Sequence, residues 1–216
     1  MTGTQPSYQP GRECAHCPRL VEFRLQNRQR FPAWHNAPVP SFGELDAKLL
    51  IVGLAPGLRG ANATGRPFTG DWAGDLLYET LLSFGCARGH YTERRDDGLE
   101  LLGCRITNAV RCVPPGNRPT PAEETACRPF LVAEMKAMPG LRAALALGGI
   151  AHGAVLAALG ERKNGHPFAH GAMHRLKGGL LLVDSYHCSR LNTNTGRLTP
   201  AMFREVVGRT LEAISA

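Results

Sequence analysis

Four short runs of strand-forming residues, separated by segments of helical character, are the feature that most constrains this fold. They cover residues 48–53, 103–108, 143–148 and 179–185. The first, third and fourth runs are mainly apolar, which is typical of strands buried on both faces, whereas the second also contains Arg105 and Thr107. Because helical crossovers between parallel strands are right-handed and cover both faces of a sheet, the pattern predicts a three-layer α/β/α sandwich on a mainly parallel four-stranded sheet.

The segments between and around these runs predict the helices. Proline positions, apolar spacing and helix-forming composition place them at 18–30, 73–84, 121–138, 151–159 and 200–214. A chain of 216 residues is long enough for one substantial core, so we expect a frayed segment over 1–12 and a single domain over 13–216. Ligands of such sheets bind at the carboxyl ends of the strands. Functional residues are therefore expected in the loops that follow the strands.

Composition and charge narrow the class of protein. Hydrophobic residues make up 43% and charged residues 20%, which excludes general disorder, and no apolar run approaches a membrane span. The first ten residues lack the pattern of a secretory signal, so we expect a cytoplasmic protein without membrane contact. The net charge is +7, mostly from arginine. This excess suits a polyanionic partner, although a codon-driven arginine preference explains it equally well.

Seven cysteines are an odd number and do not suggest a disulfide framework. Cys14 and Cys17 are two residues apart, and Cys112 and Cys127 form a wider pair after the second strand. Four thiolates can hold either a zinc ion or a four-iron cluster, and this spacing favours neither. The other three cysteines are expected to pack as small apolar residues: Cys86, Cys104 and Cys188.

A glycine-rich loop covers residues 53–71, directly after the first strand. Glycine lets backbone amides approach a ligand or adopt a positive φ. The interval between Gly60 and Gly65 matches a nucleotide-binding P-loop, but Arg66 and Pro67 replace the lysine and the hydroxyl residue that the P-loop requires. An NTPase is therefore excluded. A phosphate of a polyanionic partner stays open as a ligand for the amides between Gly60 and Gly65.

Together with residues 107–115 and 185–197, this loop resembles the uracil-DNA glycosylase superfamily, and within it the family 5 enzymes. The likeness extends from Cys14 to about Phe203. It implies an α/β/α sandwich, in agreement with the strand pattern. It also implies a four-iron, four-sulfur (4Fe-4S) cluster held by Cys14, Cys17, Cys112 and Cys127.

The resemblance further implies which residues carry the chemistry. Leu54 and Ala55 stand where relatives often have a residue that positions water, and neither can do so. The carboxylate is then assigned to Asp71, either to activate water or to stabilise the sugar cation, with Asp75 as a competitor. His187 is expected to donate a hydrogen bond to the uracil oxygen as the base departs.

Further residues are expected to bind the substrate. Asn108 offers an acceptor and donors for the base edge, although an asparagine at a strand end is often a turn residue. Phe68 supplies a ring for stacking, with core packing as the alternative. The remaining substrate contacts are assigned to the loop after the first strand, at Gly53, Ala55 and Gly57.

A base inside a duplex must be flipped out before its bond can be cleaved. Leu191 is the expected wedge that fills the gap, and an ordinary loop leucine is the alternative. The residues around it are expected to bind DNA, with arginines holding phosphates: Ser189, Arg190, Asn192 and Arg197.

The resulting hypothesis is a monomeric, monofunctional glycosylase that removes uracil, and also deaminated bases such as hypoxanthine, from double-stranded or single-stranded DNA. The three motifs contain no lysine, which argues against a lyase step. The competing hypothesis is a non-catalytic nucleic-acid-binding protein stabilised by a cluster or zinc. His166, His170 and His174 recur every fourth residue, but Pro167 and Gly171 argue against a metal-binding helix.

Overall fold

The structure is a computed structural model, and it describes residues 7–215. Its main sheet has five strands in the order β4-β1-β5-β7-β6. Four of them are parallel and fully buried, as the four runs predict. They are β1 (Leu49–Gly53), β4 (Cys104–Asn108), β5 (Ala143–Leu147) and β7 (Leu181–Ser185).

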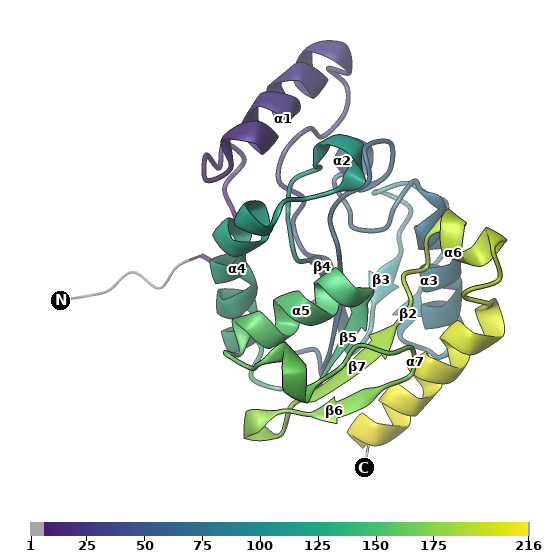
Figure 1. The fold of residues 1–216 in the computed structure, drawn as a ribbon. Helices are drawn as coiled ribbons and strands as arrows, with labels where there is room; N and C mark the ends of the chain where they lie inside the picture. The colour runs from purple at the N-terminus through teal and green to yellow at the C-terminus, as the bar shows by residue number, and fades with distance from the viewer. Residues whose placement is uncertain (1–6, 216) are drawn as a thin grey trace.

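Helices cover both faces of this sheet (Figure 1). One core cluster packs one face beneath α3 (Trp72–Ser83) and α7 (Pro200–Ser215). A second core cluster packs the other face beneath α4 (Pro121–Lys136) and α5 (Gly149–Ala158). The predicted α/β/α sandwich is therefore confirmed, and the long helices lie within about two residues of their expected bounds.

The fifth strand, β6 (Met173–Arg175), was not predicted. It pairs antiparallel with β7 at the sheet edge, so the sheet has one strand more than the predicted four. Its three residues are partly exposed and include a histidine and an arginine. A strand this short and polar has no apolar run from which it could be recognised.

Several short elements were also not predicted. A two-stranded ribbon, β2 with β3, lies outside the main sheet. The single-turn elements result from local turn geometry rather than from an apolar pattern. These additional elements are β2 (Ala87–Arg88), β3 (Glu100–Leu101), α2 (Ala61–Thr64), α6 (Arg190–Asn194), η1 (Pro115–Asn117), η2 (Lys163–Gly165) and η3 (Lys177–Gly179).

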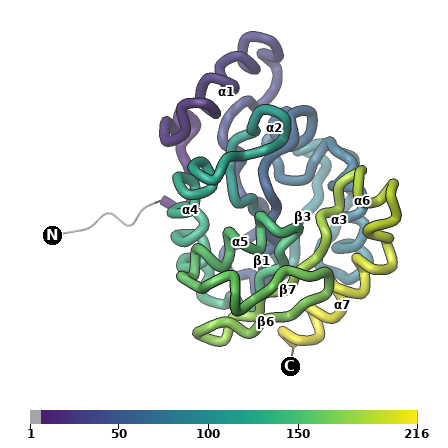
Figure 2. The backbone as a smooth tube through the Cα atoms, viewed as in Figure 1, coloured from purple at the N-terminus to yellow at the C-terminus, as the bar shows by residue number. Residues whose placement is uncertain are grey.

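The N-terminal part of the chain lies against α4. Helix α1 (Pro18–Arg30) follows Cys17 and stands at one end of the molecule (Figure 2). Arg19 on α1 binds the carboxylate of Glu123 on α4 with two bonds of 2.7 Å. The expected fraying of 1–12 falls partly on residues 1–6, which lie outside the described residues.

A buried ion network joins β4 to α4. Glu134 accepts a hydrogen bond of 2.7 Å from Arg105 Nε and one of 2.9 Å from Thr107 Oγ1, and it also pairs with Arg111. Two guanidinium groups lower the pKa of Glu134 against the effect of its burial. The network anchors the end of β4 that leads to Asn108 and Cys112. None of the helices over 7–215 has the length and apolar composition to cross a membrane.

Candidate active site and cysteine pocket

The loops after β1 and β4 begin side by side. Gly53 pairs with Asn108 in the parallel register, and the two strands end together. The strand ladder continues beyond them, because Ala109 N donates to Gly53 O over 2.9 Å and Val110 N donates to Leu54 O over 3.0 Å. The glycine-rich loop therefore starts within reach of the Asn108 side chain.

Gly53 brings Asn108 and Phe68 together. A Cβ built at Gly53 would lie 2.4 Å from Asn108 Oδ1 and 2.6 Å from the Phe68 ring. Any side chain at position 53 would thus displace both groups. Phe68 is buried and has a φ of 53°, an uncommon backbone conformation for an aromatic residue. Its carbonyl lies against Gly74, where a Cβ would come within 2.0 Å, so local packing maintains this conformation.

Asp71 caps α3 and faces the same glycine-rich loop. Its Oδ1 accepts a bond of 3.3 Å from Gly74 N. Its Oδ2 would lie 2.3 Å from a Cβ at Gly60 and 3.0 Å from one at Gly57, so these glycines make room for the carboxylate. Burial raises the pKa of Asp71, although backbone amides at the helix N-terminus oppose this effect.

His187 lies beside Phe68 on the loop after β7. The two rings are stacked, with centroids 5.9 Å apart and an interplanar angle of 27°. Desolvation lowers the pKa of His187 to about 4, so the imidazole is neutral at pH 7. Asn192 Nδ2 donates 2.8 Å to the His187 carbonyl and fixes the backbone there. Phe68 therefore connects Asn108 to His187.

Asp75 and Cys188, which lie near Asp71 and His187 in the sequence, differ in burial. Asp75, the competitor of Asp71, is exposed on α3, which agrees with a surface role. Cys188 is fully buried as predicted, and burial together with the nearby charge of Asp71 raises its thiol pKa. The charge effect indicates that Asp71 and the residue after His187 are close in space.

The segment after His187 forms the short helix α6. Ser189 caps it, accepting a bond of 3.4 Å from Asn192 N. Leu191 is 72% exposed, more than any other large hydrophobic side chain over residues 7–215. Arg190 and Arg197 are also exposed, and their guanidinium groups lie 5.6 Å from the Trp72 ring and 4.5 Å from the Tyr186 ring. The predicted DNA-binding residues thus share one segment, in which Ser189 and Asn192 are half-buried.

Trp72 was not predicted to take part in this surface. It follows Asp71 directly, is 49% exposed, and donates a hydrogen bond of 2.8 Å from Nε1 to Thr193 Oγ1. An exposed tryptophan beside a candidate catalytic carboxylate is the signal that could have identified it. Through Trp72, the start of α3 is joined to α6.

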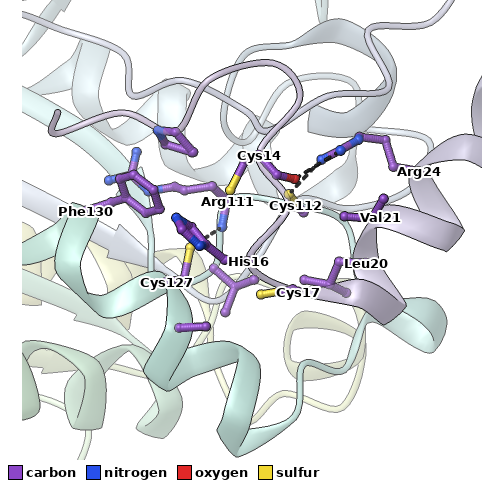
Figure 3. A pocket seen from close by; sticks show the side chains of 13 residues that line it. Cys14, His16, Cys17, Leu20, Val21, Arg24, Arg111, Cys112, Cys127 and Phe130 are labelled. Atoms are coloured by element: carbon purple, nitrogen blue, oxygen red, sulfur yellow. Dashed lines mark hydrogen bonds between the residues drawn. The ribbon is translucent and has the colours of Figure 1, made fainter. Parts of the chain in front are cut away.

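The two predicted cysteine pairs meet in one pocket between α1 and α4 (Figure 3). Residues apart in sequence line it: Cys14, Cys17, Cys112 and Cys127. Burial raises the pKa of Cys17 to about 11 and that of Cys112 to about 12, and the charge of Cys127 contributes to both increases. Thiolates this close repel one another unless a cation is present. Their donor set, sulfur alone, fits zinc or an iron–sulfur cluster.

Other groups around the pocket were not predicted. Arg111 N donates 3.4 Å to Cys127 Sγ, and the buried Arg24 places Nη1 3.9 Å from Cys112 Sγ. Donors directed at sulfur are the usual way a protein tunes bound thiolates. Ala55, predicted to contact substrate, packs against the small apolar cluster beside these cysteines. The loop after β1 therefore makes two contacts. Its Ala55 packs beside the cysteine pocket, and its Gly53 lies against Phe68.

Cys86, Cys104 and the regularly spaced histidines over 166–174 lie outside the cysteine pocket. Cys86 and Cys104 are buried, as predicted, with Cys104 Sγ 3.2 Å from the Cys86 carbonyl. No helix forms over 166–174, in agreement with the breakers at Pro167 and Gly171. His170 accepts a bond of 3.2 Å from Tyr186 N and stacks on that ring.

A family model and several known proteins relate this chain to the same family. The sequence model of the uracil DNA glycosylase superfamily matches residues 40–209. A type-5 uracil-DNA glycosylase of Thermus thermophilus is 48% identical over 200 residues, which covers 90% of each chain. The corresponding protein of Mycobacterium leprae is 45% identical, covering 89% of this chain and 88% of its own. That of Pyrobaculum aerophilum is 42% identical, covering 91% and 87%.

Proposed function

This chain belongs to the uracil DNA glycosylase superfamily, and we propose that it is a monofunctional DNA glycosylase that hydrolyses the N-glycosidic bond of uracil in DNA. The observation that carries this proposal is the stacking of Phe68 on His187 beside Asn108. Phe68 precedes Asp71 by three positions in the same loop. This combination provides a ring for the base, polar groups for its edge and a carboxylate for the sugar.

The binding step uses Phe68 and Asn108. An extruded uracil stacks on the Phe68 ring, and Asn108 bonds its Watson–Crick edge with both acceptor and donors. Gly53 and Gly57 contribute no side chain, which lets the base approach the backbone. Uracil is the primary substrate, and hypoxanthine is a further one.

The bond-breaking step separates charge. The departing base gains negative charge, and neutral His187 donates a hydrogen bond to its carbonyl oxygen. The sugar gains positive charge, and the ionised carboxylate of Asp71 stabilises it or orients the attacking water. Because Asp71 is partly desolvated, its charge acts more strongly on the sugar than an exposed carboxylate would.

DNA is held by the exposed segment after His187. Leu191 enters the duplex where the base leaves, and α6 presents it without burying it. Phosphates are bound by Ser189, Arg190, Asn192 and Arg197. Both double-stranded and single-stranded DNA are substrates in this proposal, and the protein acts as a monomer in the cytoplasm.

The cysteine pocket holds a 4Fe-4S cluster in this proposal, with Cys14, Cys17, Cys112 and Cys127 as ligands. When bound, the cluster supplies iron–thiolate bonds that join the N-terminal segment to α4. Arg24 stabilises the thiolate of Cys112, and the amide of Arg111 that of Cys127. The effect of the cluster on the reaction is indirect, because it acts through the position of Ala55 and of the loop to which Ala55 belongs.

An excision assay tests the function. Labelled duplexes with uracil or hypoxanthine, followed by alkaline cleavage of the abasic site, should be processed by the wild-type protein. Asp71→Asn and His187→Ala should lose most of the activity, whereas Asp75→Asn, changed at an exposed carboxylate, should retain it. A wild-type protein that binds the uracil duplex but leaves it uncleaved in enzyme excess would support the non-catalytic alternative.

A further inference from the structure

A buried cluster of two histidines and an aspartate lies at the β6 edge of the sheet, outside the site described above. His152 comes from α5, His174 from β6 and Asp184 from β7. One ring nitrogen of each histidine and one carboxylate oxygen all lie within 4.8 Å of one another. The side chains are 4%, 13% and 0% exposed, respectively. We refer to these three residues as the His-His-Asp cluster.

The hydrogen bonds of His152 require an extra positive charge. Its Nε2 lies 2.9 Å from the His166 carbonyl, which only accepts, so this nitrogen carries a hydrogen. Its Nδ1 lies 2.7 Å from Asp184 Oδ1. A neutral ring would then direct the Nδ1 lone pair at an ionised carboxylate. This contact is favourable only if a proton or a metal ion is shared there.

Two other atoms of the His-His-Asp cluster lack hydrogen-bond partners. His174 Nε2 and Asp184 Oδ2 are both buried and make no hydrogen bond within the described part of the chain. They lie 3.4 Å apart. In a tetrahedral zinc site the metal–ligand bonds are about 2.0–2.1 Å long. Two ligand atoms of such a site are therefore about as far apart as His174 Nε2 and Asp184 Oδ2 are here.

We propose that the His-His-Asp cluster is a binding site for a zinc-class divalent cation. Its ligands are His152 Nδ1, His174 Nε2 and Asp184 Oδ2, because His152 Nε2 is used by the His166 carbonyl. Two imidazole nitrogens and one carboxylate favour zinc over magnesium or calcium, which prefer oxygen alone. The partly exposed ring of His166, with its centroid 5.5 Å from that of His174, stands beside the site. It is available as a fourth ligand.

Such an ion would brace the loop that carries His187. It would link α5, β6 and β7 at one point. The segment between α5 and β6 also supplies Phe168 and His170, whose rings lie 6.2 Å and 5.0 Å from that of Tyr186. Tyr186 directly precedes His187. The site is therefore structural and does not depend on the proposed glycosylase activity.

Zinc binding by the intact protein is the test. Cysteines can also bind zinc. The informative quantity is therefore the difference in bound zinc per chain between proteins that keep all seven cysteines. Equilibrium dialysis at micromolar zinc should give one zinc fewer per chain for His174→Asn and for Asp184→Asn than for wild type. His90→Asn, changed at an exposed histidine, is the matched control and should bind as wild type does. Affinity at this site should fall more than about tenfold.

Thermal melting supplies a second readout. Added zinc should raise the melting temperature of the wild-type and His90→Asn proteins more than that of His174→Asn. His174 is on a partly exposed edge strand, so this variant decides the question if Asp184→Asn does not fold. Equal zinc content and equal melting shifts in wild type and His174→Asn would overturn the proposal and leave a shared proton as the charge in the cluster.

Discussion

Trp72 Nε1 donates a hydrogen bond of 2.8 Å to Thr193 Oγ1, and this contact joins the helix capped by Asp71 to the helix that presents Leu191. The guanidinium of Arg190 lies over the same indole at 5.6 Å. Two residues 121 positions apart thus connect the candidate catalytic carboxylate to the candidate wedge. The relationship suggests that DNA binding and catalysis share one rigid support.

Trp72→Phe should weaken DNA processing by loosening α6. Loss of one hydrogen bond of about 1 kcal/mol corresponds to roughly a fivefold weaker interaction, so KM for a uracil duplex should rise by about that factor. Thr193→Val removes the other partner and should act similarly. In a double-mutant cycle the combined variant should be little worse than either single one. Additive losses would contradict a shared contact.

Asp71→Asn should reduce excision while preserving the fold. Positioned carboxylates typically contribute about 10²–10⁴-fold, so the single-turnover rate should fall at least 100-fold. The pKa of Asp71 is raised above its ordinary 3.8, so the wild-type rate should fall as the pH decreases through that raised value. A pH profile of kcat on single-stranded substrate checks this, with Asp75→Asn as the control.

The same substitution should not cost stability at neutral pH. An acid with a raised folded-state pKa binds its proton more tightly when folded, so stability falls as the pH rises from 3.8 through the raised pKa. Asparagine avoids that cost and caps a helix about as well as aspartate. Asp71→Asn should therefore melt at or above the wild-type temperature at pH 7. A clear drop there would show that the charged carboxylate stabilises the fold.

His187 should remain neutral throughout the range in which the enzyme works. Its folded-state pKa is lowered from 6.5 to about 4 by desolvation. The stability associated with the neutral ring is complete above pH 6.5 and is lost as the pH falls toward 4. NMR titration of the ring should show its midpoint near 4, and His187→Gln should lessen the acid sensitivity of melting. A midpoint near 6.5 would contradict burial as the controlling factor.

Leu191→Ala should separate DNA engagement from stability. Because the side chain is 72% exposed, its loss should change the free energy of unfolding by less than about 0.5 kcal/mol. Excision from duplex DNA should fall more than excision from single strands, where no gap must be filled. Leu159→Ala, at another exposed leucine, is the matched control. Equal losses on both substrates would argue against a wedge.

Loss of the proposed 4Fe-4S cluster should destabilise the N-terminal segment. Cys112→Ser should lower iron content and the melting temperature, because the remaining thiolates would be left crowded and unpaired. Cys86→Ser, at a buried cysteine outside the pocket, should keep its iron. Broad visible absorption with iron and sulfide indicates the cluster. A colourless wild-type protein with stoichiometric zinc in this pocket would contradict it.

The sequence by itself determined the layered architecture. Four short runs, three of them mainly apolar, made the central strands recognisable because a strand buried on both faces needs no polar alternation. The motifs, through the family resemblance that they carry, also singled out Asp71, His187 and the two cysteine pairs. These signals are local in the chain, so they can be identified without knowledge of contacts.

Only the tertiary structure decided which residues meet. Gly60 makes room for Asp71, Trp72 binds Thr193, and β6 brings His174 to His152 and Asp184. Each of these contacts joins residues that no periodicity relates. They form because crossovers and strand register bring distant loops to one edge of the sheet.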